Sequence, residues 1–509
     1  MILIIDFGSQ YNQLIARRVR ESRVYCQIEP YNIGIDKIKA LAPKGIVLSG
    51  GPMSIYDKKS PKVDKRIFDL DIPILGICYG LQFMIDALKG GVKKAEKREY
   101  GFAALNIKRE HALFAGIDKT TECWMSHGDS IYKLPKGFSL LASTDNTEFT
   151  AVANEEKKLY GFQFHPEVAH TPKGKKMLEN FAINISGAKR DWTMKFFAKK
   201  AISEIKGSAK NDKVILGLSG GVDSTVTSVL LDKALGKNFT AIFVDNGLLR
   251  KNEADNLKGI FKERLKINVK FINAEDRFLD ALKKVTDPEK KRKIIGKIFA
   301  DIFEEEARKI EGVKFLAQGT LYPDIIESVS VFGGPSAVIK SHHNVGGLPK
   351  DMKLKLIEPL KYLFKDEVRK LGKTLGVNSM LIWRQPFPGP GLAIRVIGEV
   401  TKERLEVLRK ADAILLEEIH AAGYYKKLWQ SFAVLLPIKS VGVMGDSRTY
   451  ENIAAIRAVT SKDAMTADWA KLPQKLLGKI SNRIINEVSG INRVVYDISS
   501  KPPATIEWE

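Results

Sequence analysis

The chain has 509 residues, 44% of them hydrophobic, which is ordinary for a soluble globular protein of about three domains. A net charge of +22 favours anionic partners, but the basic residues are scattered, so we expect no nucleic-acid or membrane partner. Three cysteines argue against a disulfide framework, and no signal peptide or membrane-spanning segment is evident, so a cytoplasmic protein is expected.

The first 190 residues predict an α/β domain. Short, β-branched runs bounded by Gly, Pro or Asp are typical of buried parallel strands. Three such runs occur: MILIID, GIVLSGG and PILGIC. Four later runs predict antiparallel strands: LNIKR, FSLLAST, FTAVANE and LYGFQFHPE.

A cysteine lies between two glycines in GICYG, after a predicted strand and before a predicted helix. The serine form of this pattern is a sharp turn that exposes a nucleophile, and a helix N-terminus favours a thiolate at Cys78. A buried structural cysteine is the alternative. In FQFHPE, His165 and Glu167 are two residues apart and would face the same way on a strand. Alone this is a strand end; with Cys78 it predicts a Cys–His–Glu triad.

The turn LSGGPMS at 48–54 either offers a backbone N–H to an oxyanion or is a simple tight turn. Together, SGGP, GICYG and FHPE resemble class I glutamine amidotransferases, which hydrolyse glutamine to glutamate and ammonia through a thioester. The resemblance implies that Cys78 is the nucleophile, His165 the base and Glu167 its orienting group. It also implies an oxyanion hole formed by Gly51 and Tyr79, and a contact with the bound glutamine at Gln82.

Residues 191–384 alternate strands and helices again, which predicts a second doubly wound parallel sheet. The predicted strands are KVILGL, TAIFVDNG, NVKFINA and KFLAQGTL. After the first of them, GLSGGVDST at 217–225 would gather backbone N–H groups and hydroxyls at a helix N-terminus, which suits a pyrophosphate. The loop lacks the lysine of a Walker A motif. The alternative is a glycine turn capped by Asp223.

The loop resembles the PP-loop of ATP pyrophosphatases, which cleave ATP between the α and β phosphates and adenylate a substrate oxygen. In that family FVDNG is the edge that contacts adenosine. The resemblance implies that ATP is bound by Ser219, Gly220, Gly221, Val222, Asp223, Ser224 and Thr225. Mg²⁺ is expected on the ATP phosphates, with Asp223 as a possible ligand, whereas His342 and His343 point apart and predict no metal pair.

The run TDPEKKRKIIGKIF at 286–299 carries four basic residues in a row. They predict either a lid over the phosphates or a solvated helix face. These residues are Lys290, Lys291, Arg292 and Lys293.

The segment RQPFPGPGLAIR is the richest in Pro and Gly and predicts a boundary, so residues 385–509 form a third, smaller α+β domain. Its predicted order starts with strand LAIRVIG and a helix, continues with strands SFAVLLPI and VGVM, and ends with a helix and strand RVVYDIS. This βαββαβ order is compatible with a ferredoxin-like domain.

The whole chain resembles the family of glutamine-hydrolysing GMP synthases, in segments that include GTLYPDIIES, KSHHNVGGLP, PFPGPGLAIR and KPPATIEWE. The resemblance implies adenylation and amination of xanthosine monophosphate (XMP), and a homodimer built by the C-terminal domain. It also implies a nucleotide site formed by Arg277, Gln430, Lys501, Ile506 and Glu507. A tRNA-modifying PP-loop protein and a synthase with another acceptor, as in NAD synthesis, are the alternatives. All three cysteines precede the PP-loop domain, which disfavours the first, and KPPATIEWE disfavours the second.

Overall fold

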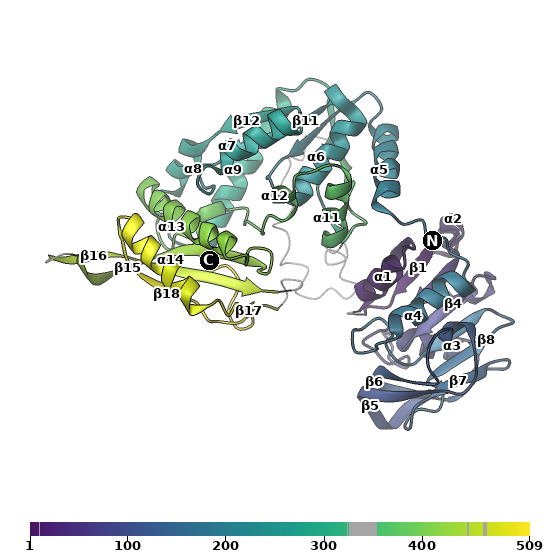
Figure 1. Ribbon diagram of the computed structural model, residues 1–509. Helices are drawn as coiled ribbons and strands as arrows, with labels where there is room; N and C mark the ends of the chain where they lie inside the picture. Colours follow the sequence, from purple (N-terminus) through teal and green to yellow (C-terminus); the bar gives the residue numbers. More distant parts are fainter. Residues whose placement is uncertain (10, 323, 325–353, 445–446, 462–465) are drawn as a thin grey trace. The chain divides into compact units, whose positions relative to one another are not determined.

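The computed structural model describes residues 1–9, 11–322, 324, 354–444, 447–461 and 466–509. These residues fold into two compact units (Figure 1). The described residues of the first unit are Met1–Phe197, and those of the second begin at Ala198. Helix α5 (Met194–Ala209) contains the division between them. Of the helices in these ranges, none is long and apolar enough to cross a lipid bilayer.

The first unit is built on a nine-stranded sheet in the order β2-β1-β3-β4-β9-β8-β7-β5-β6. Its parallel part consists of β2 (Cys26–Pro30), β1 (Ile2–Asp6), β3 (Gly45–Leu48), β4 (Ile74–Ile77) and β9 (Leu159–Phe162). Its antiparallel part consists of β8 (Ala151–Asn154), β7 (Ser139–Ser143), β5 (Gly91–Ile107) and β6 (Thr120–Lys133). The helices are α1 (Asn12–Glu21), α2 (Ile35–Leu41), α3 (Tyr79–Ala87) and α4 (Gly174–Glu179).

The seven predicted strands of this unit all form, because their apolar runs are buried along the sheet. Two further strands, β2 and β6, were not predicted. Both end the sheet and carry polar residues, so their sequences lack an apolar run that marks a strand. The prediction that FQFHPE is entirely strand is wrong at its end, since β9 stops at Phe162 and residues 163–167 form a turn.

The second unit contains a parallel sheet in the order β12-β11-β10-β13-β14. Its strands are β10 (Lys213–Gly217), β11 (Phe239–Asp245), β12 (Val269–Asn273), β13 (Val313–Ala317) and β14 (Lys355–Ile357). The accompanying helices are α6 (Val222–Leu235), α7 (Glu253–Gly259), α8 (Glu275–Leu282), α9 (Pro288–Arg308), α11 (Lys365–Thr374) and α12 (Ser379–Ile382). The predicted doubly wound arrangement is confirmed, and residues 218–221 join the first strand, β10, to α6.

A second sheet in this unit combines β15 (Gln430–Met444), β16 (Ser447–Thr460), β17 (Asp468–Trp469) and β18 (Ile491–Tyr496) with α13 (Lys402–Ala421) and α14 (Gln474–Glu487). The ferredoxin-like prediction is wrong. LAIRVIG forms a 3-10 turn in which Leu392 bonds to the Leu248 oxygen, and only one bridge, from Val396 to Leu435, joins the segment to β15. SFAVLLPI and VGVM are one strand, and β16, which was missed, pairs with both β15 and β18.

One hydrophobic core connects the two sheets of the second unit. It contains Ile215 of β10, Phe278 of α8, Leu392 after the Pro/Gly-rich segment, Leu415 of α13 and Ile480 of α14. A boundary at residues 384 and 385 stays a prediction, since the residues on either side share this core.

Candidate active sites

Cys78 lies in the turn between β4 and α3, with φ 49° and ψ −106°. Non-glycine residues rarely adopt a left-handed backbone, so the packing must hold this strain. A Cβ atom at Gly76 would lie 2.6 Å from the Leu81 nitrogen, and one at Gly80 would lie 2.4 Å from the Leu48 oxygen. Both flanking glycines are therefore required by the turn, which has the strained geometry that GICYG predicts.

The His165 and Glu167 side chains form a buried pair in the turn beyond β9. His165 Nδ1 lies 2.7 Å from Glu167 Oε1, and Glu167 is fully buried. Burial opposes a charge on the imidazole, but Glu167 and the hydrogen bond to Cys78 outweigh it and raise the pKa of His165 to about 11. The structure thus brings Cys78, His165 and Glu167 together as predicted, although through a turn and not along a strand.

The proposed oxyanion donors also meet at this turn. Tyr79 is the first residue of α3, so its backbone N–H is one of those left free at a helix start. Gly51 packs against it closely enough that a Cβ there would lie 3.0 Å from the Tyr79 ring. Gln82, one turn further along α3, donates from Nε2 to the Asp129 oxygen at 3.0 Å.

A segment of β6 lines this site and was not predicted. The Ser126 carbonyl oxygen lies 3.7 Å from Cys78 Sγ, and the Asp129 carbonyl accepts from Gln82. Between them, His127 is buried with Nε2 3.6 Å from Glu99 Oε2, which fixes the segment against β5. The polar run MSHGD was the available signal, but its role depends on the pairing of two strands.

The PP-loop forms a compact network of hydroxyl groups at the start of α6. Ser219 Oγ lies 3.0 Å from Ser224 Oγ, and Thr225 Oγ1 donates to the Gly221 oxygen at 2.8 Å. The loop turns at Gly220, whose φ is 73°. Backbone N–H groups at the positive end of a 14-residue helix suit an anion, as the sequence predicts.

A lysine from a distant part of the chain contacts the PP-loop. Lys365, the first residue of α11, donates from Nζ to Asp223 Oδ2. The other oxygen of Asp223 is buried and has no hydrogen-bond partner within the described residues. A distance of 142 positions separates the two residues, so no local motif could reveal this pair.

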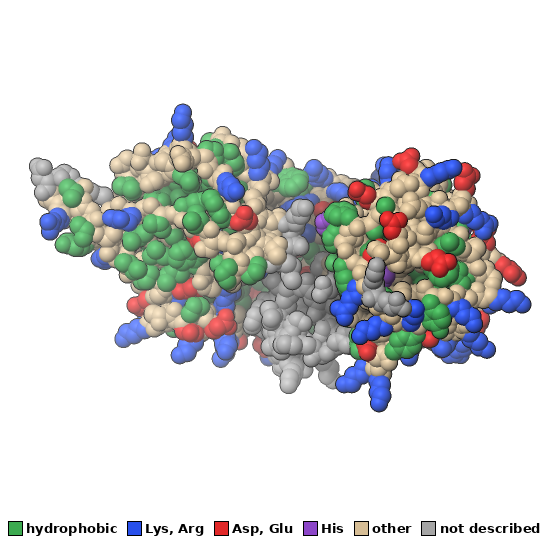
Figure 2. All heavy atoms as spheres, turned by 90° about the horizontal axis from the view of Figure 1, so that it is seen from below, with side chains coloured by type: hydrophobic (Ala, Val, Ile, Leu, Met, Phe, Trp, Pro, Cys, Tyr) green, Lys and Arg blue, Asp and Glu red, His purple; other side chains and the backbone are tan. Residues whose placement is uncertain are grey.

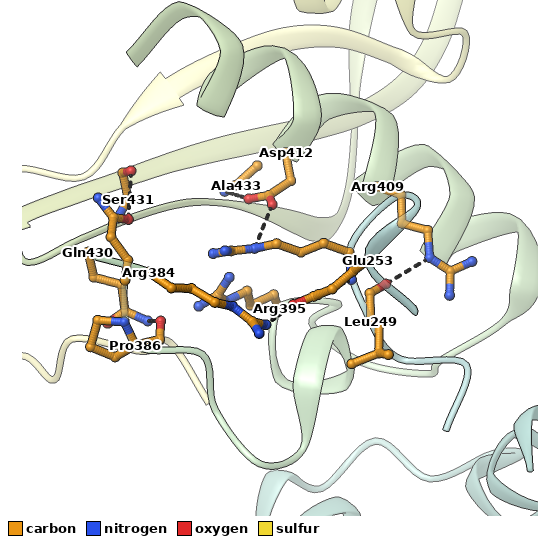
Figure 3. Close-up of polar contacts among 12 residues, drawn as sticks. Leu249, Glu253, Arg384, Pro386, Arg395, Arg409, Asp412, Gln430, Ser431 and Ala433 are labelled. Carbon is orange, nitrogen blue, oxygen red and sulfur yellow. Dashed lines mark hydrogen bonds and ion pairs between the residues drawn. The ribbon is translucent and has the colours of Figure 1, made fainter. Parts of the chain in front are cut away.

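Three of the predicted nucleotide residues lie together at the C-terminal tail. Glu507 accepts a bidentate ion pair from the buried Arg395 at 2.8 and 3.0 Å, and a hydrogen bond from Gln430 Nε2 at 2.6 Å. Gln430 also donates to the Pro386 oxygen (Figure 3). Ile506 is buried in the core of the second sheet. The tail is therefore docked, as the sequence predicts.

The two other predicted nucleotide residues have different surroundings. Lys501 exchanges backbone hydrogen bonds with Ala467 at 2.7 and 3.0 Å. Arg277 of α8 forms a bidentate ion pair with Glu305 of α9, so the described contacts do not join it to the tail. A cavity of about 540 Å³ is lined by residues 495–499, 504, 505, 507 and 508, which include Glu507.

The basic run at the start of α9 is not a fully solvated face, and its role as a lid stays a prediction. Lys291 is completely buried and donates to the Ala393 and Val396 oxygens at 3.1 and 2.9 Å and to Glu509 Oε2 at 2.5 Å. Lys290 and Lys293 are exposed. The segments around residues 325–328 and KSHHNVGGLP, with His342 and His343, lie outside the described residues.

Family models match three parts of the chain. The glutamine amidotransferase class-I model matches residues 3–185, the NAD synthase model matches residues 196–300, and the GMP synthase C-terminal domain model matches residues 417–508. The first match contains the triad, and the second contains the PP-loop.

Curated relatives match the chain over its whole length. A protein of Brachyspira hyodysenteriae described as glutamine-hydrolysing GMP synthase is 58% identical over 508 residues, covering 100% of this chain and 99% of the relative. A protein of Clostridium tetani with the same description is 58% identical over 509 residues, with the same coverage. Because this identity extends through both sites and the C-terminal tail, the chain belongs to the family of glutamine-hydrolysing GMP synthases.

Proposed function

We propose that the first unit releases ammonia from glutamine at Cys78 and that the second unit uses it to convert XMP to GMP. The activity follows from membership of the family. The observation that supports the first half most directly is the strained cysteine turn facing a buried His165–Glu167 pair. The alternatives of a tRNA-modifying enzyme or another acceptor have no comparable support, since both full-length relatives named above are described as GMP synthases.

In the first step, the Cys78 thiolate attacks the amide carbon of glutamine, and the oxyanion forms between the N–H groups of Gly51 and Tyr79. His165 gives its proton to the leaving nitrogen, so ammonia departs and a thioester remains. Water, deprotonated by the same imidazole, then releases glutamate. Glu167 holds the imidazolium form, and Gln82 lies beside the substrate.

In the second step, the 2-oxygen of XMP attacks the α-phosphorus of ATP, and pyrophosphate leaves toward the PP-loop. Ammonia then displaces AMP from the adenylated carbon, which gives GMP. The pyrophosphate is held by the backbone N–H groups and hydroxyls of residues 219–225 and by the charge of Lys365. Negative charge develops on the pyrophosphate as the bond between the α and β phosphates of ATP breaks. Lys365 supplies a cation there, in place of the lysine that a Walker A loop carries.

We also propose Mg²⁺ for this site, because Asp223 has a buried oxygen without a partner among the described residues. When bound, Mg²⁺ neutralises phosphate charge. XMP is assigned to Gln430, Lys501, Ile506 and Glu507, with Arg277 as a further contact. Arg277 would have to exchange its ion pair with Glu305 for the nucleotide phosphate, and both residues of this pair are partly exposed.

We also propose three domain assignments and a location in the cell. Residues 1–190 are the glutaminase, 191–384 the PP-loop domain, and 385–509 the dimerisation and nucleotide domain. A cytoplasmic location is supported by three buried cysteines, none of which forms a disulfide.

The homodimer is assigned to the C-terminal sheet, where large hydrophobic side chains are exposed. They lie on the β15–β16 hairpin and on β18, with exposed fractions between 39% and 74%: Ile438, Val441, Val443, Tyr450 and Val495. Figure 2 shows hydrophobic side chains gathered on this part of the surface, at the left. A group of this kind marks an interaction surface. Val443→Asp should shift the mass measured by light scattering from two copies to one, whereas Lys475→Asp on α14 should not.

The central experiment compares glutamine with ammonium salts as nitrogen donor. Cys78→Ala should abolish GMP formation from glutamine and retain formation from ammonium, with pyrophosphate release dependent on XMP. Gln163→Ala, which removes the amide 3.8 Å from Cys78 Sγ, serves as a milder variant at the same turn. Loss of ammonium-dependent synthesis in a folded Cys78→Ala protein would contradict the division of labour.

A further inference from the structure

We infer that Arg384 is a positioning residue for the ATP site, which joins the PP-loop to the loop after β11 and fixes both. The inference rests on the ATP site proposed above. It adds a residue that the PP-loop motif does not contain and that lies 164 positions away from it.

The first contact of Arg384 is with the turn of the PP-loop. Arg384 Nη1 donates to the Gly220 oxygen at 2.6 Å. In a trans peptide the C=O and the following N–H point in opposite directions, so this bond directs the Gly221 N–H to the other side of the peptide. There the Gly221 nitrogen lies 3.3 Å from Ser219 Oγ, within the hydroxyl network of the loop. Arg384 therefore orients a peptide dipole that faces the proposed phosphate position.

The side chains of Arg384 and Leu257 pack directly against Gly220 and leave no room for a side chain there. A Cβ atom at Gly220 would lie 2.7 Å from Arg384 Nη1 and 2.6 Å from a Leu257 methyl group. Gly220 also has φ 73°, which favours glycine. Two independent reasons therefore favour glycine at position 220: its backbone conformation and the guanidinium that packs against it.

The second contact of Arg384 is with the start of α7. Its Nη2 forms an ion pair with Glu253 Oε1, and the side chains are only 13% and 10% exposed. Glu253 Oε2 accepts from the Arg250 backbone nitrogen at 2.9 Å and so closes the loop after β11. Arg384 consequently bridges the loops at the carboxyl ends of neighbouring strands β10 and β11, where open α/β sheets bind ligands.

The loop after β11 is also held from α13. Arg409 donates from Nε to the Leu249 oxygen at 3.0 Å (Figure 3). Its Nη2 donates to the Gly247 oxygen. Leu392 donates its backbone N–H to the Leu248 oxygen at 2.8 Å. Both loops of the proposed ATP site are therefore fixed by residues from outside the PP-loop sequence.

Residues next to Arg384 reach the proposed nucleotide site. Gln385 Oε1 accepts from the Ser431 backbone nitrogen at 2.8 Å, and the Pro386 oxygen accepts from Gln430, which also holds Glu507. Three consecutive residues thus contact the PP-loop on one side and Gln430 and Ser431 of β15 on the other, and Gln430 in turn holds Glu507 of the tail. Burial and the nearby Arg250 lower the pKa of Arg384 to about 10, so it remains a cation at neutral pH.

The test measures XMP-dependent pyrophosphate release with ammonium as donor, which makes the readout independent of Cys78. Arg384→Met should lower kcat about 100-fold, the order of loss expected when groups that hold the substrate are displaced by about 1 Å, and Arg384→Lys should retain part of the rate. Arg264→Met removes an exposed arginine that lies just beyond α7, and this variant should match the wild type. Glutamine hydrolysis measured without ATP and XMP should be unchanged in all variants.

Chemical rescue separates positioning from loss of folding. In Arg384→Ala, added methylguanidinium should restore pyrophosphate release several-fold, with no effect on Arg264→Ala. An Arg384→Met protein as active as Arg264→Met, or an Arg384→Ala protein that is inactive and not rescued, would overturn the inference. Absence of pyrophosphate release by the wild type with XMP and ATP would instead refute the proposed function.

Discussion

Replacement of Lys291 by Met tests whether the start of α9 holds the C-terminal tail. The Lys291 ammonium has no exposed surface and gives its hydrogen bonds to Ala393, Val396 and Glu509. Methionine keeps most of the volume but removes all of these donors. Among the described residues, the side-chain carboxylate of Glu509 is then left with the Gly398 N–H at 3.3 Å, a weak partner for a buried charge, while Arg292 still donates to the Glu509 main-chain oxygen.

Removal of one partner of a buried ion pair costs about 3–5 kcal/mol, mainly because the remaining charge is desolvated without compensation. Glu507, two residues from Glu509, is the proposed XMP contact. If about 1.4 kcal/mol of this cost appears as displacement of the tail from the site, KM for XMP rises about tenfold. We therefore expect Lys291→Met to raise KM for XMP and to reduce hydrogen-exchange protection of the tail.

The assay compares Lys291→Met with Lys293→Met, which removes an exposed charge from the same helix turn. A Lys291→Met, Glu509→Leu double variant should be less impaired than the sum of the two single variants, because it leaves no unpaired charge. Equal KM for XMP and equal exchange in the Lys291→Met and Lys293→Met proteins would refute the reasoning.

Two further predictions concern the glutaminase. Despite burial, Glu167 raises the pKa of His165 from 6.5 to about 11. The ion pair between them therefore stabilises the folded protein fully below pH 6.5, and this contribution is lost as the pH rises toward 11. Glu167→Gln should therefore move the alkaline loss of glutaminase activity to lower pH, and an unchanged pH profile would contradict this cause. Gly80→Ala should reduce glutaminase activity about 100-fold or more, because the added methyl group would collide with the Leu48 oxygen and displace the Cys78 turn. Gly34→Ala adds a methyl group that meets no atom within 4 Å and should leave the activity unchanged. Equal activities of the two variants would count against the steric explanation.

The sequence alone determined the features whose causes are local. The turn at Cys78 needs glycines at fixed spacing, and the PP-loop needs small residues between a strand and a helix. These signals involve neighbours along the chain, so their pattern could be read directly.

The tertiary structure decided the features that join distant residues. Strands β6 and β16 form because a neighbouring strand accepts their backbone hydrogen bonds, and their own residues are too polar or too mixed to indicate a strand. Lys365, Arg384 and Lys291 each contact a partner more than 100 positions away in the sequence. The sequence around a basic residue does not indicate which distant carboxylate or carbonyl it will contact, so only the folded chain could show these pairs.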